Sequence, residues 1–156
     1  MKYRILLFIV LFQAASCVTV EVCDDSNDSE LVAKFKTRHE GVAADSTVAS
    51  LSLYGIREGK SDSLLYNAQP SSGFEVPLDP HYDFSLFVLQ INEQTDTLTV
   101  YHHHESYMIS YTCGFGNLFT LDNIGLGNGI IKSDTILNDM IDAENENDEE
   151  HIWLYL

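Results

Sequence analysis

Apolar and polar residues alternate along most of this chain of 156 residues, whereas helical periodicity is scarce. In the segment 31–38, Leu31, Ala33 and Phe35 fall on one face of an extended chain, with lysine and arginine on the other. Successive side chains of a β-strand point to opposite faces, so a period of two predicts a half-buried strand. Further strand candidates are residues 47–54, 62–66, 74–78, 82–91, 95–102, 107–112, 118–121 and 151–156.

These candidates are short and follow one another at the spacing of all-β domains. About eight strands separated by turn residues predict a single antiparallel β-sandwich or partly open barrel over residues 31–156. The most apolar candidate, 82–91, is expected to be a central strand. The last, 151–156, is apolar on both faces. Because such a terminus would aggregate if exposed, we expect it to pair inside a sheet.

The N-terminus has the organisation of an export signal. Lys2 and Arg4 precede an apolar run, 5–12, which is too short to span a bilayer, and small residues follow it. We therefore expect a signal peptide over residues 1–16. The next residue, Cys17, lies where the lipobox of bacterial lipoproteins has its acylated cysteine.

The position of Cys17 predicts a lipid anchor, with palmitate among its acyl chains, and a lipidated, acidic tether over residues 17–30. The domain would then be held at a membrane of the cell envelope, either facing the periplasm or exposed on the surface. The alternative is an ordinary secretory signal, in which Cys17 is incidental.

The charge of the chain limits its partners. Eight lysine and arginine residues stand against 24 aspartate and glutamate residues, a net charge of −16. Loss of Lys2 and Arg4 with the signal makes the mature chain still more acidic. Because such a field repels phosphate backbones, we expect no nucleic-acid partner. An envelope protein, a glycan or a basic peptide is the expected type of partner.

Two cysteines remain once Cys17 is assigned to lipidation. Cys23 and Cys113 are an even pair in a chain expected in a compartment that permits disulfides. They predict a disulfide bond across a loop of about 90 residues, worth roughly 4–5 kcal/mol in the chain-entropy model. Two buried thiols are the alternative.

The run of three histidines at 102–104 is the one constellation with metal-binding character. On a strand, His102 and His104 point to the same face and offer two imidazoles to Zn²⁺ or Cu²⁺. Two ligands are an incomplete set, and the alternative is a polar hairpin end at the surface. No complete catalytic motif occurs, so no catalytic residue and no cofactor is predicted, and an enzymatic function is disfavoured.

A short motif, Asp followed by Ser or Thr, recurs before apolar or threonine residues. It resembles the O-glycosylation signal of exported proteins of Bacteroidota. The alternative is that Asp-Ser and Asp-Thr pairs open strands after turns. The acceptor candidates are Ser46, Ser63, Thr97 and Thr135.

The chain resembles a known family in four features taken together. These are the cysteine after the signal, a second cysteine in an acidic setting, a Tyr-x-Cys-Gly-Phe segment and the acidic turn into His-Ile-Trp-Leu-Tyr-Leu. That family comprises small uncharacterised lipoproteins of Bacteroidota, a domain of unknown function. Its markers here are Cys23, Cys113, Gly114, Phe115, Asn145, Glu146 and His151. The resemblance implies an exported β-rich lipoprotein and no known activity. The expected function is therefore a binding or accessory module of the cell envelope, with metal binding through His102 and His104 as the alternative.

Overall fold

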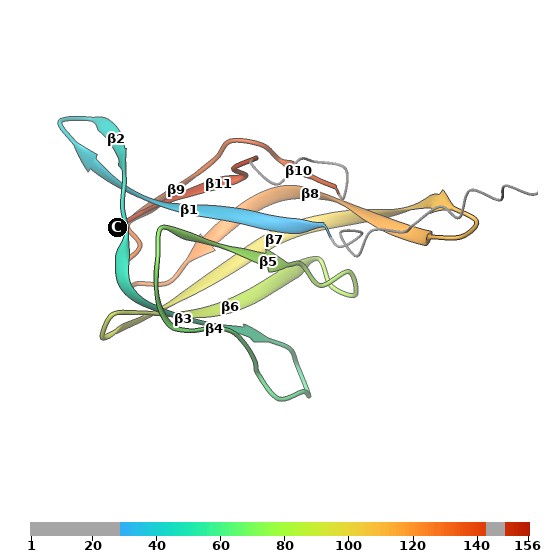
Figure 1. Cartoon of the computed structure of the whole chain (residues 1–156), viewed down its shortest axis with the longest axis horizontal. Helices are drawn as coiled ribbons and strands as arrows, with labels where there is room; N and C mark the ends of the chain where they lie inside the picture. Colours follow the sequence, from blue (N-terminus) through green and yellow to red (C-terminus); the bar gives the residue numbers. More distant parts are fainter. Residues whose placement is uncertain (1–28, 143–148) are drawn as a thin grey trace, which may run out of the picture.

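The computed structural model describes residues 29–142 and 149–156, which form two packed β-sheets without a helix (Figure 1). Each sheet is open, since neither returns to its own first strand. The all-β sandwich prediction is therefore confirmed, and the barrel alternative is not adopted. The strands are β1 (Glu30–His39), β2 (Val42–Asp45), β3 (Val48–Ile56), β4 (Ser63–Ser71), β5 (Gly73–Pro77), β6 (Phe84–Ile91), β7 (Gln94–Ser110), β8 (Gly114–Leu126), β9 (Ser133–Ile136), β10 (Met140–Ile141) and β11 (Ile152–Tyr155).

The first sheet has the order β2-β1-β11-β9, and β5 also pairs with β1. One pairing departs from the antiparallel prediction: β1 and β11 run parallel, with Ala33 opposite Ile152 and Phe35 opposite Leu154. Parallel neighbours need a long connection between them, and here the whole second sheet lies between β1 and β11 in the sequence. The alternation in each strand reveals which side chains are buried, but not which strand lies beside it.

The second sheet has the order β10-β8-β7-β6-β3-β4 and is antiparallel throughout. β6, the expected central strand, lies between β7 and β3. The turn from β6 to β7 was expected at residues 92–94, and Ile91 indeed pairs with Gln94 across it. Asn92 has a φ of 55° there, a left-handed conformation that asparagine tolerates in tight hairpins.

Two segments are longer strands than the sequence pattern predicted. Residues 95–102 and 107–112 belong to one strand, β7, which ends at Ser110 before a turn and Gly114, whose φ is 78°. β4 continues through Pro70 to Ser71, beyond the predicted strand 62–66. β4 is the edge strand of its sheet, and an edge is where a strand tolerates a residue without an N–H group.

The core lies between the two sheets and is built from the inward-facing positions of both. Ile152 and Leu154 are completely buried, so the apolar C-terminal segment pairs inside a sheet as expected. On the outer face of β11, Lys36 Nζ lies 4.6 Å from the ring centroid of Trp153, and the Arg38 guanidinium lies 4.3 Å from the ring centroid of Tyr155. Long cationic side chains thus cover the aromatic residues on the outer side of β11.

A buried carboxylate organises the glycine-rich loop after β8. Asp96 is only 3% exposed and accepts backbone N–H groups from Thr97, Gly129 and Ile131. A Cβ atom at Gly129 would lie 2.5 Å from Asp96 Cγ, and one at Gly127 would lie 2.4 Å from Asp96 Oδ1. The glycines are therefore required by close packing around this carboxylate. Within residues 29–142 and 149–156, no helix is long and apolar enough to cross a membrane.

Candidate ligand-binding pocket

A pocket of about 340 Å³ lies between the β3–β4 hairpin and the segment that leads from β5 into β6. Its walls are largely apolar, and several aromatic rings contribute to them. Tyr82 and Phe84 are 44% and 45% exposed, with ring centroids 6.0 Å apart. Leu65 contributes from β4 and Phe87 from β6. The volume is at the lower end of the range of about 300–1,000 Å³ for small-molecule sites.

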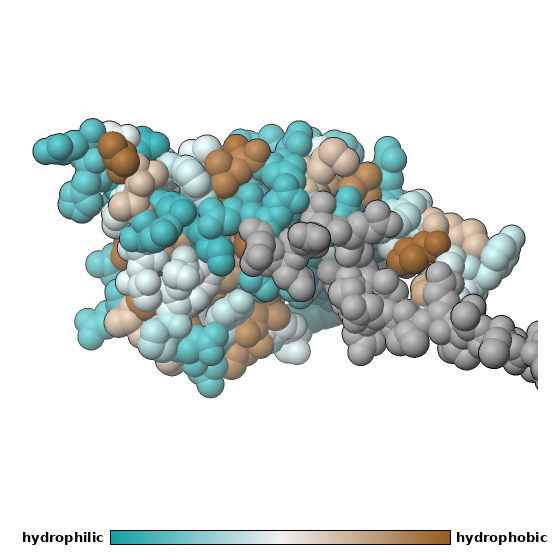
Figure 2. Space-filling model, turned by 45° about the horizontal axis from the view of Figure 1, so that its top comes forward, coloured by the Kyte–Doolittle hydropathy of each residue, from teal (hydrophilic) through white to brown (hydrophobic). Residues whose placement is uncertain are grey.

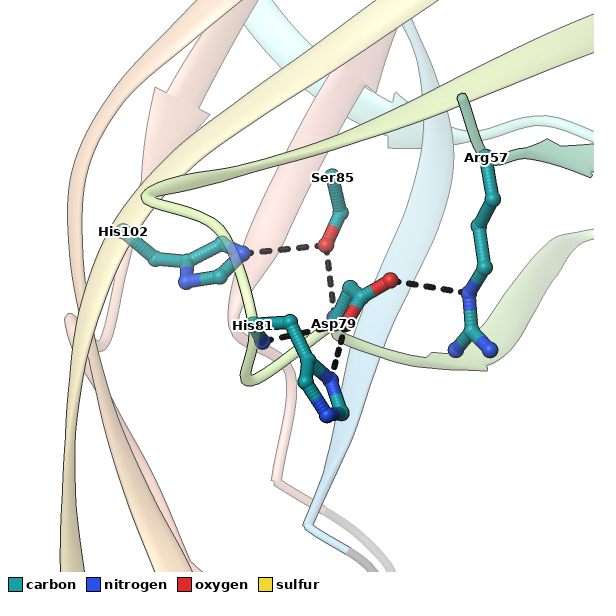
Figure 3. A network of polar contacts seen from close by, with 5 residues as sticks. All are labelled: Arg57, Asp79, His81, Ser85 and His102. Carbon is teal, nitrogen blue, oxygen red and sulfur yellow. Dashed lines mark hydrogen bonds and ion pairs between the residues drawn. The ribbon is translucent and has the colours of Figure 1, made fainter. Parts of the chain in front are cut away.

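Asp79 is the centre of a polar network on one wall of this pocket (Figure 3). Its Oδ2 atom lies 2.8 Å from Arg57 Nε, and its Oδ1 atom lies 3.0 Å from His81 Nδ1. Oδ1 also accepts the backbone N–H of His81 at 3.0 Å. The Asp79 side chain is 9% exposed, and that of Arg57 is 48% exposed. A buried carboxylate thus holds a half-exposed guanidinium by one of its nitrogens.

The local sequence explains why the chain turns at Asp79. An aspartate that accepts the N–H two residues on forms an Asx turn, and Pro80 in between has no N–H to satisfy. The turn is fixed to the sheet because the backbone N–H of Asp79 donates to Ser85 Oγ at 2.8 Å. Ser85 Oγ in turn lies 2.9 Å from Nε2 of His102 on β7.

The contacts of Asp79 also set its charge. Burial on its own would raise the pKa of the carboxyl group, but the hydrogen bonds from His81 and the charge of Arg57 outweigh it. The pKa of Asp79 is therefore below its usual value, and the group is ionised at neutral pH.

Arg57 keeps most of its hydrogen-bonding capacity. Its Nε atom is occupied by Asp79, and its two terminal nitrogens have no hydrogen bond or ion pair with any residue that the structure describes. Figure 3 shows these two nitrogens pointing away from Asp79. A guanidinium in this state offers a fork of N–H donors that matches a carboxylate or another bidentate acceptor.

His102 does not lie at a polar surface, as the alternative to the metal prediction supposed. It is completely buried, its Nε2 contacts Ser85, and its ring packs edge-on against Phe119 at 5.2 Å. Burial, followed by the nearby imidazole of His104, lowers the pKa of His102, so the ring is neutral at pH 7.

His104 points to the same side of β7 and packs in a tilted arrangement against the same Phe119 ring, with centroids 5.9 Å apart. Within the described ranges, no group of three His, Cys, Asp or Glu side chains is arranged to hold a metal ion. The pair His102 and His104 shares a face as predicted, and none of the described residues supplies a third ligand there.

The Ser85–His102 pair is not part of a Ser–His–Asp triad. A triad needs an acid at the imidazole nitrogen that faces away from the serine. Nδ1 of His102 is buried and has no hydrogen-bond partner in the structure, and the carboxylate of Asp79 is engaged by Arg57 and His81 instead. The geometry is that of a structural link between β6, β7 and the turn at Asp79.

The remaining predicted sites lie on or beside different elements of the fold. Ser63 at the start of β4 and Thr97 on β7 are exposed, whereas Ser46 before β3 and Thr135 on β9 are partly buried. Cys113 lies in the turn between β7 and β8. Cys17, Cys23 and the signal segment 1–16 lie outside the described residues, so lipidation and the disulfide stay predictions.

Sequence reasoning missed Arg57 and Asp79. The Asp-Pro-His sequence at 79–81 was a readable turn signal, because aspartate before proline favours turn initiation. Nothing in the sequence pairs that turn with Arg57, which comes from a different hairpin 22 residues earlier.

Comparisons with known proteins define the family of the chain and no activity. No curated protein and no solved structure matches it. A model for a family of unknown function, DUF6452, matches residues 50–156, which cover β4 to β11 and nearly all of β3. The pocket and its polar network fall inside this match. The chain therefore belongs to the DUF6452 family of unknown function.

Proposed function

We propose that this chain is an exported lipoprotein whose β-sandwich acts as a binding module of the cell envelope, and that its ligand occupies the pocket beside Arg57. The observation that carries the binding proposal is the guanidinium fork held at the wall of an apolar pocket by the buried carboxylate of Asp79. The N-terminal signal and the position of Cys17 support export and anchoring.

The walls indicate the chemistry of the ligand. Apolar and aromatic side chains such as Leu65, Phe84 and Phe87 favour a hydrocarbon or aromatic group. The open nitrogens of Arg57 favour an acceptor at one end of that group, and a carboxylate fits the fork best. The ligand we propose is an apolar molecule, or the apolar end of a larger one, that carries a carboxylate.

The test compares three probes of equal chain length that differ in the head group: octanoate, 1-octanol and n-octylamine. Binding is measured by isothermal titration calorimetry on the purified protein. We expect octanoate to bind most tightly and the amine most weakly, because only octanoate brings a negative charge whose two oxygens pair with the two open nitrogens of the guanidinium. Equal binding of all three, or binding of none, contradicts the proposal.

Arg57→Gln is the variant that isolates the fork. Hydrogen bonds to charged groups contribute about 1.5–3 kcal/mol when well shielded. Arg57 is half exposed, so the lower end applies and the affinity for octanoate should fall roughly tenfold. Lys60→Gln is the matched control, because Lys60 belongs to the same hairpin but does not line the pocket. It should leave binding unchanged.

The metal-binding alternative makes a different prediction. A site at His102 and His104 requires Zn²⁺ or Cu²⁺ to raise the melting temperature, and His104→Ala should abolish that rise. His102 would have to exchange its contact with Ser85 for the metal. The pocket proposal predicts no metal-dependent shift for either protein.

The Cys23–Cys113 disulfide forms part of the proposal for an exported chain. Mass spectrometry of the unreduced protein after alkylation tests it. One bridge should protect both residues from the reagent, and alkylation at both positions contradicts the pairing.

A further inference from the structure

β7 and β8 extend beyond the rest of their sheet as a two-stranded ribbon. β6 pairs with β7 only as far as Tyr101, and β10 pairs with β8 only at Phe119 and Thr120. The β7–β8 pairing continues to Ser110 and Gly114. In Figure 1 this ribbon projects to the right of the sandwich.

The tip of the ribbon is apolar and uncharged. Tyr111 is 99% exposed, Phe115 is 74% exposed and Met108 is 48% exposed. Figure 2 shows brown and tan atoms exposed at this right-hand end of the molecule. Residues 106–121 contain no charged side chain, although 21% of the whole chain is charged. An exposed group of this kind marks an interaction site in a chain that is otherwise strongly acidic.

The described chain begins beside this ribbon. Ser29 is buried and donates a hydrogen bond from Oγ to the backbone carbonyl of Asn117 on β8 at 2.5 Å. Asn117 is three residues from the end of β8 at Gly114, so the tip lies about 10 Å further along the strand. Cys17 is 12 residues before Ser29, a length of chain that spans up to about 40 Å when extended.

We infer that the ribbon tip, formed by Met108, Tyr111 and Phe115, contacts the membrane that holds the anchor. The inference rests on the lipid anchor proposed above, because the anchor brings this end of the sandwich to the bilayer. Tyrosine suits the boundary between head groups and acyl chains, since its ring is apolar and its hydroxyl stays hydrated. Because the tip carries no charge, its approach avoids the large desolvation penalty that a lysine or glutamate would impose.

The contact also sets the orientation of the sandwich. The β1–β2 hairpin, with Val42 69% exposed, lies at the opposite end of the molecule from the tip (Figure 1). A tip at the bilayer therefore places that hairpin away from the surface. The predicted Cys23–Cys113 bridge would join the tether to the same turn that carries Tyr111.

The experiment places a fluorescent reporter at each end. The full chain is expressed with its signal, extracted from membranes and reconstituted into phosphatidylcholine vesicles with brominated acyl chains, which quench tryptophan at short range. Tyr111→Trp carries a reporter at the tip, and Val42→Trp is the matched control at the other end. The parent protein, with Trp153 alone, supplies the baseline. Flotation of the vesicles measures anchoring independently of quenching.

We expect all three proteins to float with the vesicles, and brominated lipid to quench the added fluorescence at position 111 but not at position 42. Flotation with equal quenching at both positions overturns the tip contact and leaves the anchor intact. A chain that does not float overturns both. The octanoate titration tests ligand binding in the pocket separately, and the vesicle results do not bear on it.

Discussion

The ion pair between Arg57 and Asp79 is the interaction on which the pocket depends, and its strength can be measured by a double-mutant cycle. Asp79→Asn removes the negative charge. When the oxygen of the new amide accepts the backbone N–H of His81, its NH₂ group faces the Nε–H of Arg57, so that two donors stand opposite each other. The lost ion pair contributes about 1 kcal/mol, because Arg57 is half exposed and water screens it.

We therefore expect Asp79→Asn to lower the free energy of unfolding by about 1 kcal/mol. Arg57→Gln should lower it by about 1 kcal/mol, because the carboxylate keeps the hydrogen bonds from His81. The double variant should cost about 1 kcal/mol less than the sum of the two, which is the coupling energy of the pair.

The assay is urea unfolding followed by the fluorescence of Trp153, the one tryptophan of the chain. Trp153 lies on β11 in the other sheet, so its signal reports unfolding of the sandwich and not a local change at the pocket. A coupling energy within about 0.3 kcal/mol of zero, the usual limit for independent sites, would refute the argument that Asp79 holds the guanidinium in place.

Two further predictions concern buried polar groups. Burial lowers the pKa values of His102 and His151 from 6.5, so their stabilising effect is complete above pH 6.5. This stabilisation is then lost as the pH falls towards their folded-state pKa values, by up to about 1.4 kcal/mol per pH unit for each ring. Urea unfolding between pH 7.5 and 5 should show this slope in the free energy of unfolding, and His102→Asn should reduce the slope. Gly129→Ala should cost about 1–3 kcal/mol because its Cβ meets the Asp96 side chain. Gly55→Ala, whose Cβ would make only an ordinary contact at 3.7 Å, should cost less; equal costs in thermal unfolding would contradict the packing argument.

The strand content of this fold was readable from the sequence because burial on one face imposes a period of two. β6 and β11 were predicted with nearly their observed bounds, since each is a dense run of apolar and aromatic residues. The parallel pairing of β1 with β11 was not readable, because alternation is the same in parallel and antiparallel strands that are buried on one face. The pattern predicts two strands, 95–102 and 107–112, in place of the single β7, because the residues between them, 103–106, are polar.

The polar middle of β7 was misread because a sequence gives the type of a side chain but not its neighbours. Ser85 on β6 and Phe119 on β8 make the interior acceptable to His102, and both come from other parts of the chain. The same holds for Asp96, which accepts N–H groups from the adjacent Thr97 and from Gly129 and Ile131, 33 and 35 residues later. His102 and Asp96 are of residue types common in functional sites, but their contacts within the fold are structural.

The choice of Arg57 as the candidate binding residue follows from the hydrogen bonds that its neighbours have already made. A buried polar group must find partners, so one that is fully satisfied within the fold has little left for a ligand. Asp79 is satisfied by Arg57 and His81, and its effect is to leave two nitrogens of Arg57 open at the pocket. The groups that the fold positions without saturating are the ones that remain for binding. Nδ1 of His102 also has no partner, but that ring is completely buried and out of reach of a ligand. Arg57 is half exposed at the pocket, so it is the residue to test before any of the histidines.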